Sequence, residues 1–269
     1  TLSGSLGGSL RRSQAGLGVD ANVVLDEISV GRRTITAVRG KVVKKPTGSL
    51  VKIEDLAGKF YGGQLDGFAE IRLGDPLRYG FRVTVDGVDL NELFNADVKD
   101  PKDRVKVDGK LVGSTIEVTA TEGPKPDREA AGMLRITEAK LVKMPILLDV
   151  LNVIYLSVPQ KWAFTDAYLT YHLRGDKLVF QEIYLVGGAS SVVGSGTMNV
   201  KTEQLELTFL VGPPGKLPRI SRLAEEFLGG VLRELVEWRV TGTLKHPQRR
   251  PIPLRTLDAI IKRLLNPGK

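Results

Sequence analysis

The side chains that could carry out chemistry are few and lie far apart in this sequence. The chain has no cysteine and only two histidines, His172 and His246. Without cysteine there is no disulfide framework, zinc knuckle or thiol catalysis, and the two histidines do not have a metal-ligand spacing. His172 lies in an alternating run with Asp166, Tyr168 and Thr170, which predicts a side chain facing solvent. The sequence therefore predicts neither a metal nor a cofactor.

Serine, glycine and acidic residues also fall short of catalytic patterns. Gly188–Val192 lacks the second glycine of a nucleophile elbow, and Gly194–Gly196 lacks its spacing. Gly212–Lys216 is similar to a phosphate loop, but it contains prolines and is followed by Leu217 instead of Ser or Thr. The acidic residues are scattered along the polar positions and give no local carboxylate pair. We expect no enzyme; a hydrolase would need one of the histidines beside a serine and a carboxylate.

Composition limits the partners of this 269-residue chain. The net charge of +8 favours an anionic neighbour, but aromatics are only 6% and are not interleaved with basic residues, so nucleic acid is not expected. No stretch reaches the ~18–20 apolar residues of a membrane span. The most apolar run, Ile146–Leu156, is interrupted by Asp149 and Asn152. The start at Thr1 carries no leader-like pattern, so any targeting or anchoring segment is expected upstream.

Alternation of apolar and polar residues dominates the chain and predicts strands. The clearest runs are Val19–Asp26, Phe81–Asp86, Thr115–Thr121 and Leu205–Val211. Short turn sequences connect the runs: Tyr61–Gln64, Asp86–Gly87, Asp108–Gly109, Gly175–Asp176 and Gly187–Gly188. Strands joined by such short turns must be antiparallel, because a parallel crossover needs many more residues. We expect about a dozen antiparallel strands.

Two internal segments break the alternation and are predicted to be helices. Pro145–Leu156 begins with proline and is apolar nearly all round, which is typical of a buried helix. Leu217–Val236 has apolar residues at the 3,4 spacing of an amphipathic helix. Its Gly229–Gly230 pair weakens the centre by about 1 kcal/mol per glycine.

A third helix is predicted at the C-terminus, over Pro253–Leu265, with apolar residues on one face and basic residues elsewhere. Two interpretations are open. The helix lies on an anionic membrane surface, as basic amphipathic helices do, or it packs as a terminal cap on the sheet. We favour the cap.

Two linker-like stretches suggest the organisation of the chain. Glu122–Asp127 is rich in glycine and proline, and Lys245–Pro251 is a basic turn bracketed by prolines. The predicted parts are therefore an N-terminal β portion over 1–122, a C-terminal β region with two helices over 128–251, and a helix over 252–269. The first boundary need not separate independent domains.

A succession of motifs in the C-terminal half resembles the C-terminal region of AsmA-like proteins of the bacterial envelope, the group that includes TamB and YhdP. In order, the motifs are Gly132–Leu141, Met144–Leu147, Phe164–Ala167, Leu178–Ile183, Gly194–Val200, Leu205–Leu207 and Val240–Pro247. Upstream, Leu56–Leu65 also fits the strand style of that family. Members of the family usually carry an N-terminal membrane anchor and a longer β region, which we expect to lie outside the given sequence.

The resemblance implies a long, curled β-sheet groove whose apolar concave face shelters lipid acyl chains between two membranes. It also implies a place on the periplasmic side of the bacterial envelope, with a tether through a missing N-terminal segment. The expected fold is mainly β: a long curled antiparallel sheet, as an open groove or a flattened sandwich, with two or three short capping helices. The expected lining residues are Phe81, Val83, Val85, Ile116, Val118, Leu205, Leu207 and Phe209.

Alternation alone leaves a second interpretation open. A closed β core filled by its own side chains shows the same pattern as a lipid-filled groove. In that case we expect a structural or assembly protein that supports envelope partners and outer-membrane biogenesis.

Overall fold

The computed structural model describes most of the chain. The described residues are all except 1–2, 14–15, 31–32, 105–106, 125, 141–163, 189, 215–216, 218, 221–234, 245, 253–260, 263, 266 and 268–269.

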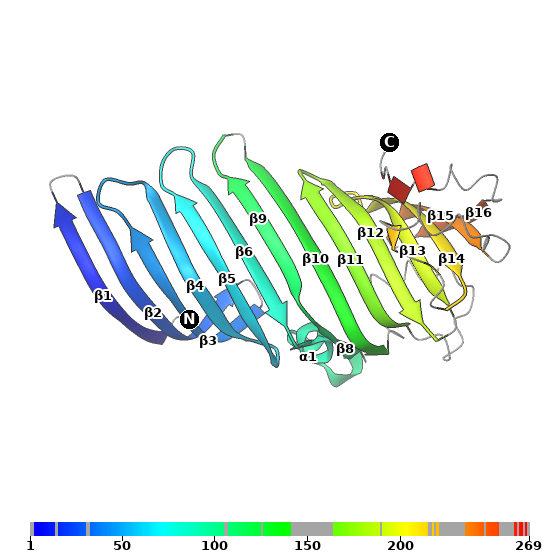
Figure 1. Cartoon of the computed structure of the whole chain (residues 1–269), viewed down its shortest axis with the longest axis horizontal. Helices are drawn as coiled ribbons and strands as arrows, with labels where there is room; N and C mark the ends of the chain where they lie inside the picture. The colour runs from blue at the N-terminus through cyan, green and yellow to red at the C-terminus, as the bar shows by residue number, and fades with distance from the viewer. Residues whose placement is uncertain are drawn as a thin grey trace. The chain divides into compact units, whose positions relative to one another are not determined.

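The described residues form one large antiparallel sheet of 16 strands with very few helices, which confirms the predicted mainly β fold (Figure 1). The sheet is open, because its strand order runs from β1 to β16 without closing. Strands pair in chain order, β1-β2-β3-β4-β5-β6-β9-β10-β11-β12-β13-β14-β15-β16, while β7 and β8 pair beside this path. Short connections explain most of this meander, whereas longer segments join β6 to β9, β10 to β11 and β14 to β15.

The strands are β1 (Ser3–Ser13), β2 (Gly16–Val30), β3 (Arg33–Lys44), β4 (Leu50–Phe60), β5 (Gly63–Arg72), β6 (Arg78–Asp86), β7 (Val88–Asp89), β8 (Asp108–Leu111), β9 (Ser114–Thr121), β10 (Asp127–Lys140), β11 (Phe164–Arg174), β12 (Lys177–Gly187), β13 (Ser191–Asn199), β14 (Gln204–Gly212), β15 (Val236–Thr243) and β16 (Pro247–Ile252). A short helix α1 (Leu90–Asn95) and a 3₁₀ turn η1 (Pro101–Asp103) follow β7.

The chain divides into two compact units, which we describe separately. Unit 1 comprises Thr1–Arg104 and Lys110–Gly132, and unit 2 comprises Val105–Gly109 and Met133–Lys269. The division falls inside β10. The predicted linker Glu122–Asp127 connects β9 to β10.

Helix α1 of unit 1 was not predicted, and its ends show why it forms. The Asp89 carboxylate caps the helix by accepting a hydrogen bond from the Glu92 backbone N–H at 3.0 Å. The Arg33 guanidinium of β3 donates to the Leu93 carbonyl and lies 3.7 Å from the Asp97 carboxylate. Six residues are too few to show a helical period in the sequence, so the cap and this long-range contact decide the structure.

The predicted helices have different outcomes. Pro145–Leu156 lies outside the described residues. For Leu217–Val236 the predicted end is wrong, since Val236 is the first residue of β15, where it pairs with Val211. Of the C-terminal helix, Ile261, Lys262, Leu264 and Leu265 are described and are helical.

Candidate functional site

Unit 1 carries a continuous row of apolar side chains and glycines across seven strands. The residues of this row are directly paired from strand to strand: Gly8 (β1), Ala21 (β2), Val42 (β3), Ile53 (β4), Ala69 (β5), Phe81 (β6) and Val118 (β9). Because side chains two apart in a strand share a face, the neighbouring row lies on the same side of the sheet. That row consists of Val19, Lys44, Val51, Ile71, Tyr79 and Ala120, with one charged member.

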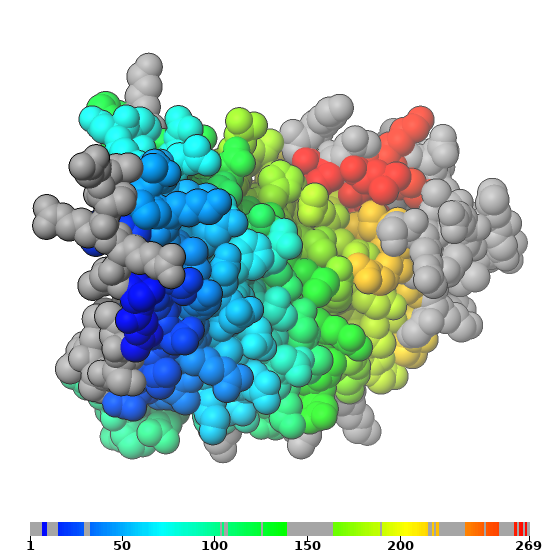
Figure 2. Space-filling view, turned by 60° about the vertical axis from the view of Figure 1, so that its left-hand side comes forward, coloured from blue at the N-terminus to red at the C-terminus, as the bar shows by residue number. Residues whose placement is uncertain are grey.

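A third, shorter row extends this surface, which we call the apolar face. It joins Leu56, Gly67, Val83 and Ile116, each paired with the next. At Gly67 a Cβ atom would lie 2.3 Å from the Arg82 carbonyl oxygen, so only glycine allows β5 and β6 to approach this closely. Figure 2 shows these strands as neighbouring bands, blue through cyan to green, in the order of the chain.

The apolar face is only partly shielded from solvent. Val42, Ile53, Phe81, Val83 and Val118 are all half-buried, and Ile116 is 37% exposed. Ala21, which pairs with Gly8 and Val42, is buried. In an antiparallel sheet one face normally packs on a core and the other is polar and solvated. An apolar surface that the chain itself does not fully bury is typical of a site that contacts a ligand, a membrane or another protein.

The opposite face of unit 1 carries more charged side chains, although Val24 and Phe68 are exposed on it. Cross-strand ion pairs run along it: Lys41 with Asp20 at 3.1 Å, Lys52 with Glu70 at 3.4 Å, and Arg82 with Glu117 at 2.5 Å. An open depression of about 450 Å³ lies on this face around Gly80 and is lined by charges of both signs. Because the two faces differ so clearly in polarity, the apolar face is the distinctive surface of unit 1.

The eight predicted lining residues divide between the two units. Five lie on the apolar face of unit 1, where Phe81 pairs with Val118 and Val83 pairs with Ile116, with Val85 next along β6. The other three lie on β14 of unit 2 and are buried, with Leu205 5%, Leu207 1% and Phe209 0% exposed.

The buried set in unit 2 is filled by its own side chains. A Cβ at Gly194 would lie 2.3 Å from the Phe209 ring, so this ring occupies the space above the glycine of its cross-strand neighbour. Leu207 lies over Gly196 in the same way. On β11 of the same face, burial raises the pKa of the Tyr171 hydroxyl. Leu207 and Phe209 therefore offer no surface to a ligand in this conformation.

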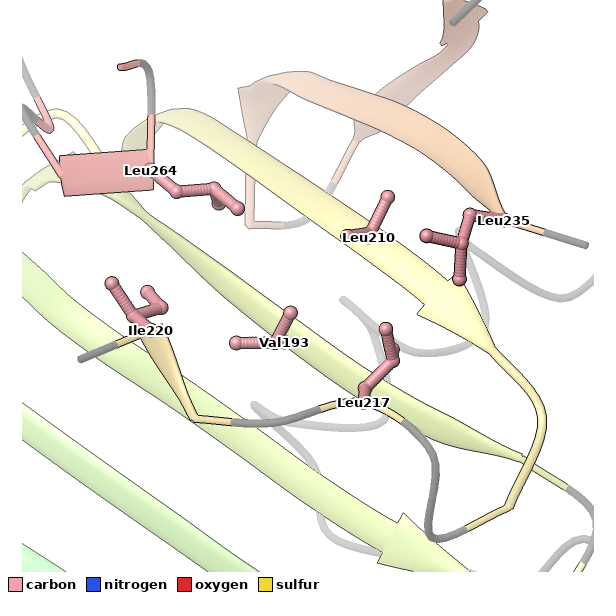
Figure 3. Close-up of a cluster of buried hydrophobic side chains, with 6 residues drawn as sticks. All are labelled: Val193, Leu210, Leu217, Ile220, Leu235 and Leu264. Carbon is pink, nitrogen blue, oxygen red and sulfur yellow. The ribbon is translucent and has the colours of Figure 1, made fainter. Parts of the chain in front are cut away.

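The other face of unit 2 is covered by segments from the C-terminal part of the chain (Figure 3). Six buried hydrophobic side chains form one cluster on this face. Val193 lies on β13, Leu210 on β14 and Leu264 in the C-terminal helix, while Leu217, Ile220 and Leu235 lie between β14 and β15. Leu264 is fully buried in it. This contact agrees with the interpretation of the C-terminal helix as a cap on the sheet.

Polar contacts of Glu182 with Arg219 and Ile220 hold the segment after β14 on this face, and we call them the Glu182–Arg219 latch. The buried Glu182 carboxylate of β12 accepts hydrogen bonds from Arg219 Nε at 3.0 Å and from the Ile220 backbone N–H at 2.7 Å. The Arg219 guanidinium also lies over the Tyr168 ring, 3.6 Å from its centroid. The hydrogen bond to Glu182 raises the pKa of Arg219. Nothing in the sequence indicated the latch, because its partners are 37 residues apart.

We expect Glu182→Ala to destabilise unit 2 by about 2 kcal/mol, because it leaves the Ile220 N–H and Arg219 without their acceptor. Urea unfolding measures this effect. The matched control is Glu206→Ala, whose carboxylate pairs with Arg239 where both side chains are at least half-exposed. Such a pair contributes less than about 1 kcal/mol. Equal losses in the two variants would contradict a structural role for the latch.

The described residues contain no group of three or more His, Asp or Glu side chains that could hold a metal ion. His172 lies on β11 opposite Val179 and is half-buried rather than fully in solvent, while His246 lies exposed in the connection from β15 to β16. Ser195 is buried in β13, and its hydroxyl has no hydrogen-bond partner among the described residues. No helix in the described part of the chain is both long and apolar enough to cross a membrane.

Comparisons with protein-family models, with curated proteins and with solved structures found no match to this chain.

Proposed function

We propose that this chain is a non-enzymatic protein of the bacterial cell envelope that holds or conducts lipid acyl chains along the apolar face of unit 1. The observation that carries the proposal is the row of seven directly paired residues from Gly8 to Val118, most of them apolar and half-buried. The ordered motifs similar to those of AsmA-like proteins support the envelope location. The net charge of +8 is compatible with anionic membranes nearby.

The dimensions of the apolar face suit an acyl chain. Six steps between neighbouring strands, at about 4.8 Å each, make the row about 29 Å long. The hydrocarbon core of a bilayer is about 30 Å thick, so one leaflet contributes about half that length. The row could therefore accommodate an acyl chain at full length with room for displacement along it. Burial of each methylene group contributes about 0.8 kcal/mol, so such a surface needs no specific polar contact to hold a lipid tail.

The alternative is a structural or assembly protein of the envelope with a closed β core. It is favoured by unit 2, where Leu207 and Phe209 are buried over Gly196 and Gly194. The two functions differ in what contacts unit 1. In lipid binding, acyl chains contact the apolar face, whereas in the alternative a partner protein contacts it.

Site-specific photo-crosslinking tests the proposal. We expect a photoreactive residue at Val83 to form adducts with co-purifying lipid, detected by mass spectrometry of the intact protein. A photoreactive residue at Leu207 should react with neighbouring side chains, because that position is 1% exposed. If Val83 captures no lipid, and extraction of the purified chain yields none, the lipid proposal fails. If Val83 captures another protein instead, the assembly function is supported.

A further inference from the structure

The turn between β5 and β6 of unit 1 has a symmetric sequence that the proposed function does not use. Residues Arg72–Arg78 are Arg-Leu-Gly-Asp-Pro-Leu-Arg, and all seven are exposed. We call this segment the β5–β6 tip. Its two leucines, Leu73 and Leu77, are 45% and 36% exposed. They lie at the end of a hairpin, where the apolar face does not bury them, so their surface is available to an apolar phase outside the chain.

Hydrogen bonds to the neighbouring turns hold the backbone of the tip in place. The Leu73 N–H donates to the Ser49 carbonyl at 2.8 Å, and the Leu77 carbonyl accepts from the Glu122 N–H at 2.8 Å. Ser49 lies in the β3–β4 turn and Glu122 in the β9–β10 connection. Both leucines are therefore presented from a backbone that is bonded on each side.

A third exposed leucine lies on the same border of the sheet. Leu17, near the start of β2, is 50% exposed, and its carbonyl accepts a hydrogen bond from Lys44 Nζ at 2.8 Å. Lys44 ends β3, directly before the turn that contains Ser49. Alternate turns of an antiparallel meander lie on one border, and Figure 1 shows the β3–β4 and β5–β6 turns as neighbours there. The exposed leucines thus gather on one border of unit 1.

Two arginines flank the leucines of the tip. Arg72 and Arg78 are direct cross-strand partners, and both are exposed. Like charges directly opposite each other destabilise an antiparallel pair. Neither guanidinium forms an ion pair with a residue that the structure describes. An anion that contacts both arginines would remove their repulsion.

The acidic residues near the tip leave this charge largely uncompensated. Asp75 is the one acidic residue of the tip, which therefore keeps a net charge of +1 from two arginines and one aspartate. The Glu122 carboxylate is engaged, since it accepts hydrogen bonds from Arg128 at 2.8 Å and from the Tyr79 hydroxyl at 3.1 Å. Lys45, exposed in the β3–β4 turn, adds another positive charge to this border.

We propose that the β5–β6 tip attaches unit 1 to the surface of an anionic phospholipid membrane. Leu73 and Leu77 insert among the first carbons of the acyl chains, and Arg72 and Arg78 donate charge-assisted hydrogen bonds to lipid phosphates. The order of residues matches the layers of a membrane surface, with apolar side chains at the end of the hairpin and basic ones directly behind them. The attachment stands whether or not the apolar face holds acyl chains.

Site-specific labelling tests the position of the tip directly. The chain has no cysteine, so Leu73→Cys gives a single site for an environment-sensitive fluorophore. We expect its emission to shift to the blue on mixed phosphatidylcholine–phosphatidylglycerol vesicles and to be quenched by lipids with a nitroxide on the upper acyl chain. A label at Val24→Cys, which is 51% exposed within β2, should show neither effect. No change at Leu73, or equal changes at both positions, would overturn the proposal.

Vesicle co-sedimentation of matched variants measures the contribution of the leucines. Leu73→Ser/Leu77→Ser should lower the partition coefficient onto the mixed vesicles at least about tenfold, because each leucine loses its transfer into the acyl region. The control Val24→Ser/Val200→Ser changes two exposed apolar residues outside the tip and should bind as the unaltered chain does. Equal partition of the two double variants would overturn insertion of the tip.

The arginines are tested in the same assay. Arg72→Gln/Arg78→Gln should lower the partition coefficient at least about fivefold on the mixed vesicles, and less on vesicles of phosphatidylcholine alone. The control Lys59→Gln/Lys201→Gln removes the same charge from two exposed positions outside the tip and should have a smaller effect. Equal losses in the two variants would indicate attraction by net charge alone and would overturn the contact with phosphates.

A substitution on the apolar face separates the tip from the proposed function. Val83→Asp leaves the tip unchanged, so it should bind vesicles normally even where its co-purifying lipid is lost. Loss of vesicle binding in Val83→Asp, with normal binding in Leu73→Ser/Leu77→Ser, would place the membrane contact on the apolar face and overturn the role of the tip.

Discussion

The double variant Val83→Asp/Val118→Asp is expected to lose its co-purifying lipid. Both side chains lie on the apolar face, on the neighbouring strands β6 and β9, and both are half-buried. If each aspartate displaces about two methylene contacts of a bound chain, at about 0.8 kcal/mol each, the loss is about 3 kcal/mol, or about a hundredfold in affinity. Native mass spectrometry and quantitative lipid extraction of the purified variants measure the bound lipid.

The matched control for this experiment lies on the same two strands. Thr84→Asp/Thr119→Asp introduces the same charges one residue away, on the opposite face of the sheet. We expect this control to retain its lipid, because that face already carries ion pairs such as Arg82 with Glu117. If both double variants lose lipid to the same extent, net charge and not the apolar face determines binding, and the proposed function is wrong.

The second large effect is expected in the core of unit 2. Phe209→Ala should lower the free energy of unfolding by about 3–5 kcal/mol, because the ring is fully buried and its removal leaves a cavity over Gly194. Urea unfolding followed by tryptophan fluorescence suits this measurement. The chain has two tryptophans, and one of them, Trp238, is the cross-strand partner of Phe209.

The control for Phe209→Ala is an exposed apolar residue of the same unit. Val200 follows β13 and is 41% exposed, so Val200→Ala should change the free energy of unfolding by less than about 0.5 kcal/mol. A similarly small effect of Phe209→Ala would mean that β14 opens readily. In that case Leu207 and Phe209 could take part in lipid binding, as the sequence suggested.

The sequence by itself determined many of the strands and their two faces, but it predicted a turn over Lys245–Pro251, where Pro247–Ile252 forms β16. Alternation is a local property with a period of two residues, so Phe81–Asp86 and Leu205–Val211 identify both the strand and its apolar side without knowledge of neighbours. Short turns such as Gly175–Asp176 then require antiparallel pairing. These local rules account for the mainly β fold, whereas the pairing of Phe81 and Val83 with β9 joins strands that β7, α1 and β8 separate in the sequence and was decided by the tertiary structure.

Only the tertiary structure decided which apolar side chains are accessible. Val83 and Phe209 have the same alternating pattern, yet Val83 is half-buried and Phe209 is fully buried. This difference in burial depends on the cross-strand neighbour, since Phe209 fills the space over Gly194 on β13. The Glu182–Arg219 latch and the burial of Leu264 likewise join residues distant in sequence. The alternation that predicts a strand involves only residues close together in the sequence. The exposure of a side chain depends on contacts between residues far apart in the chain. For this reason the apolar face of unit 1 could be located only in the folded sheet.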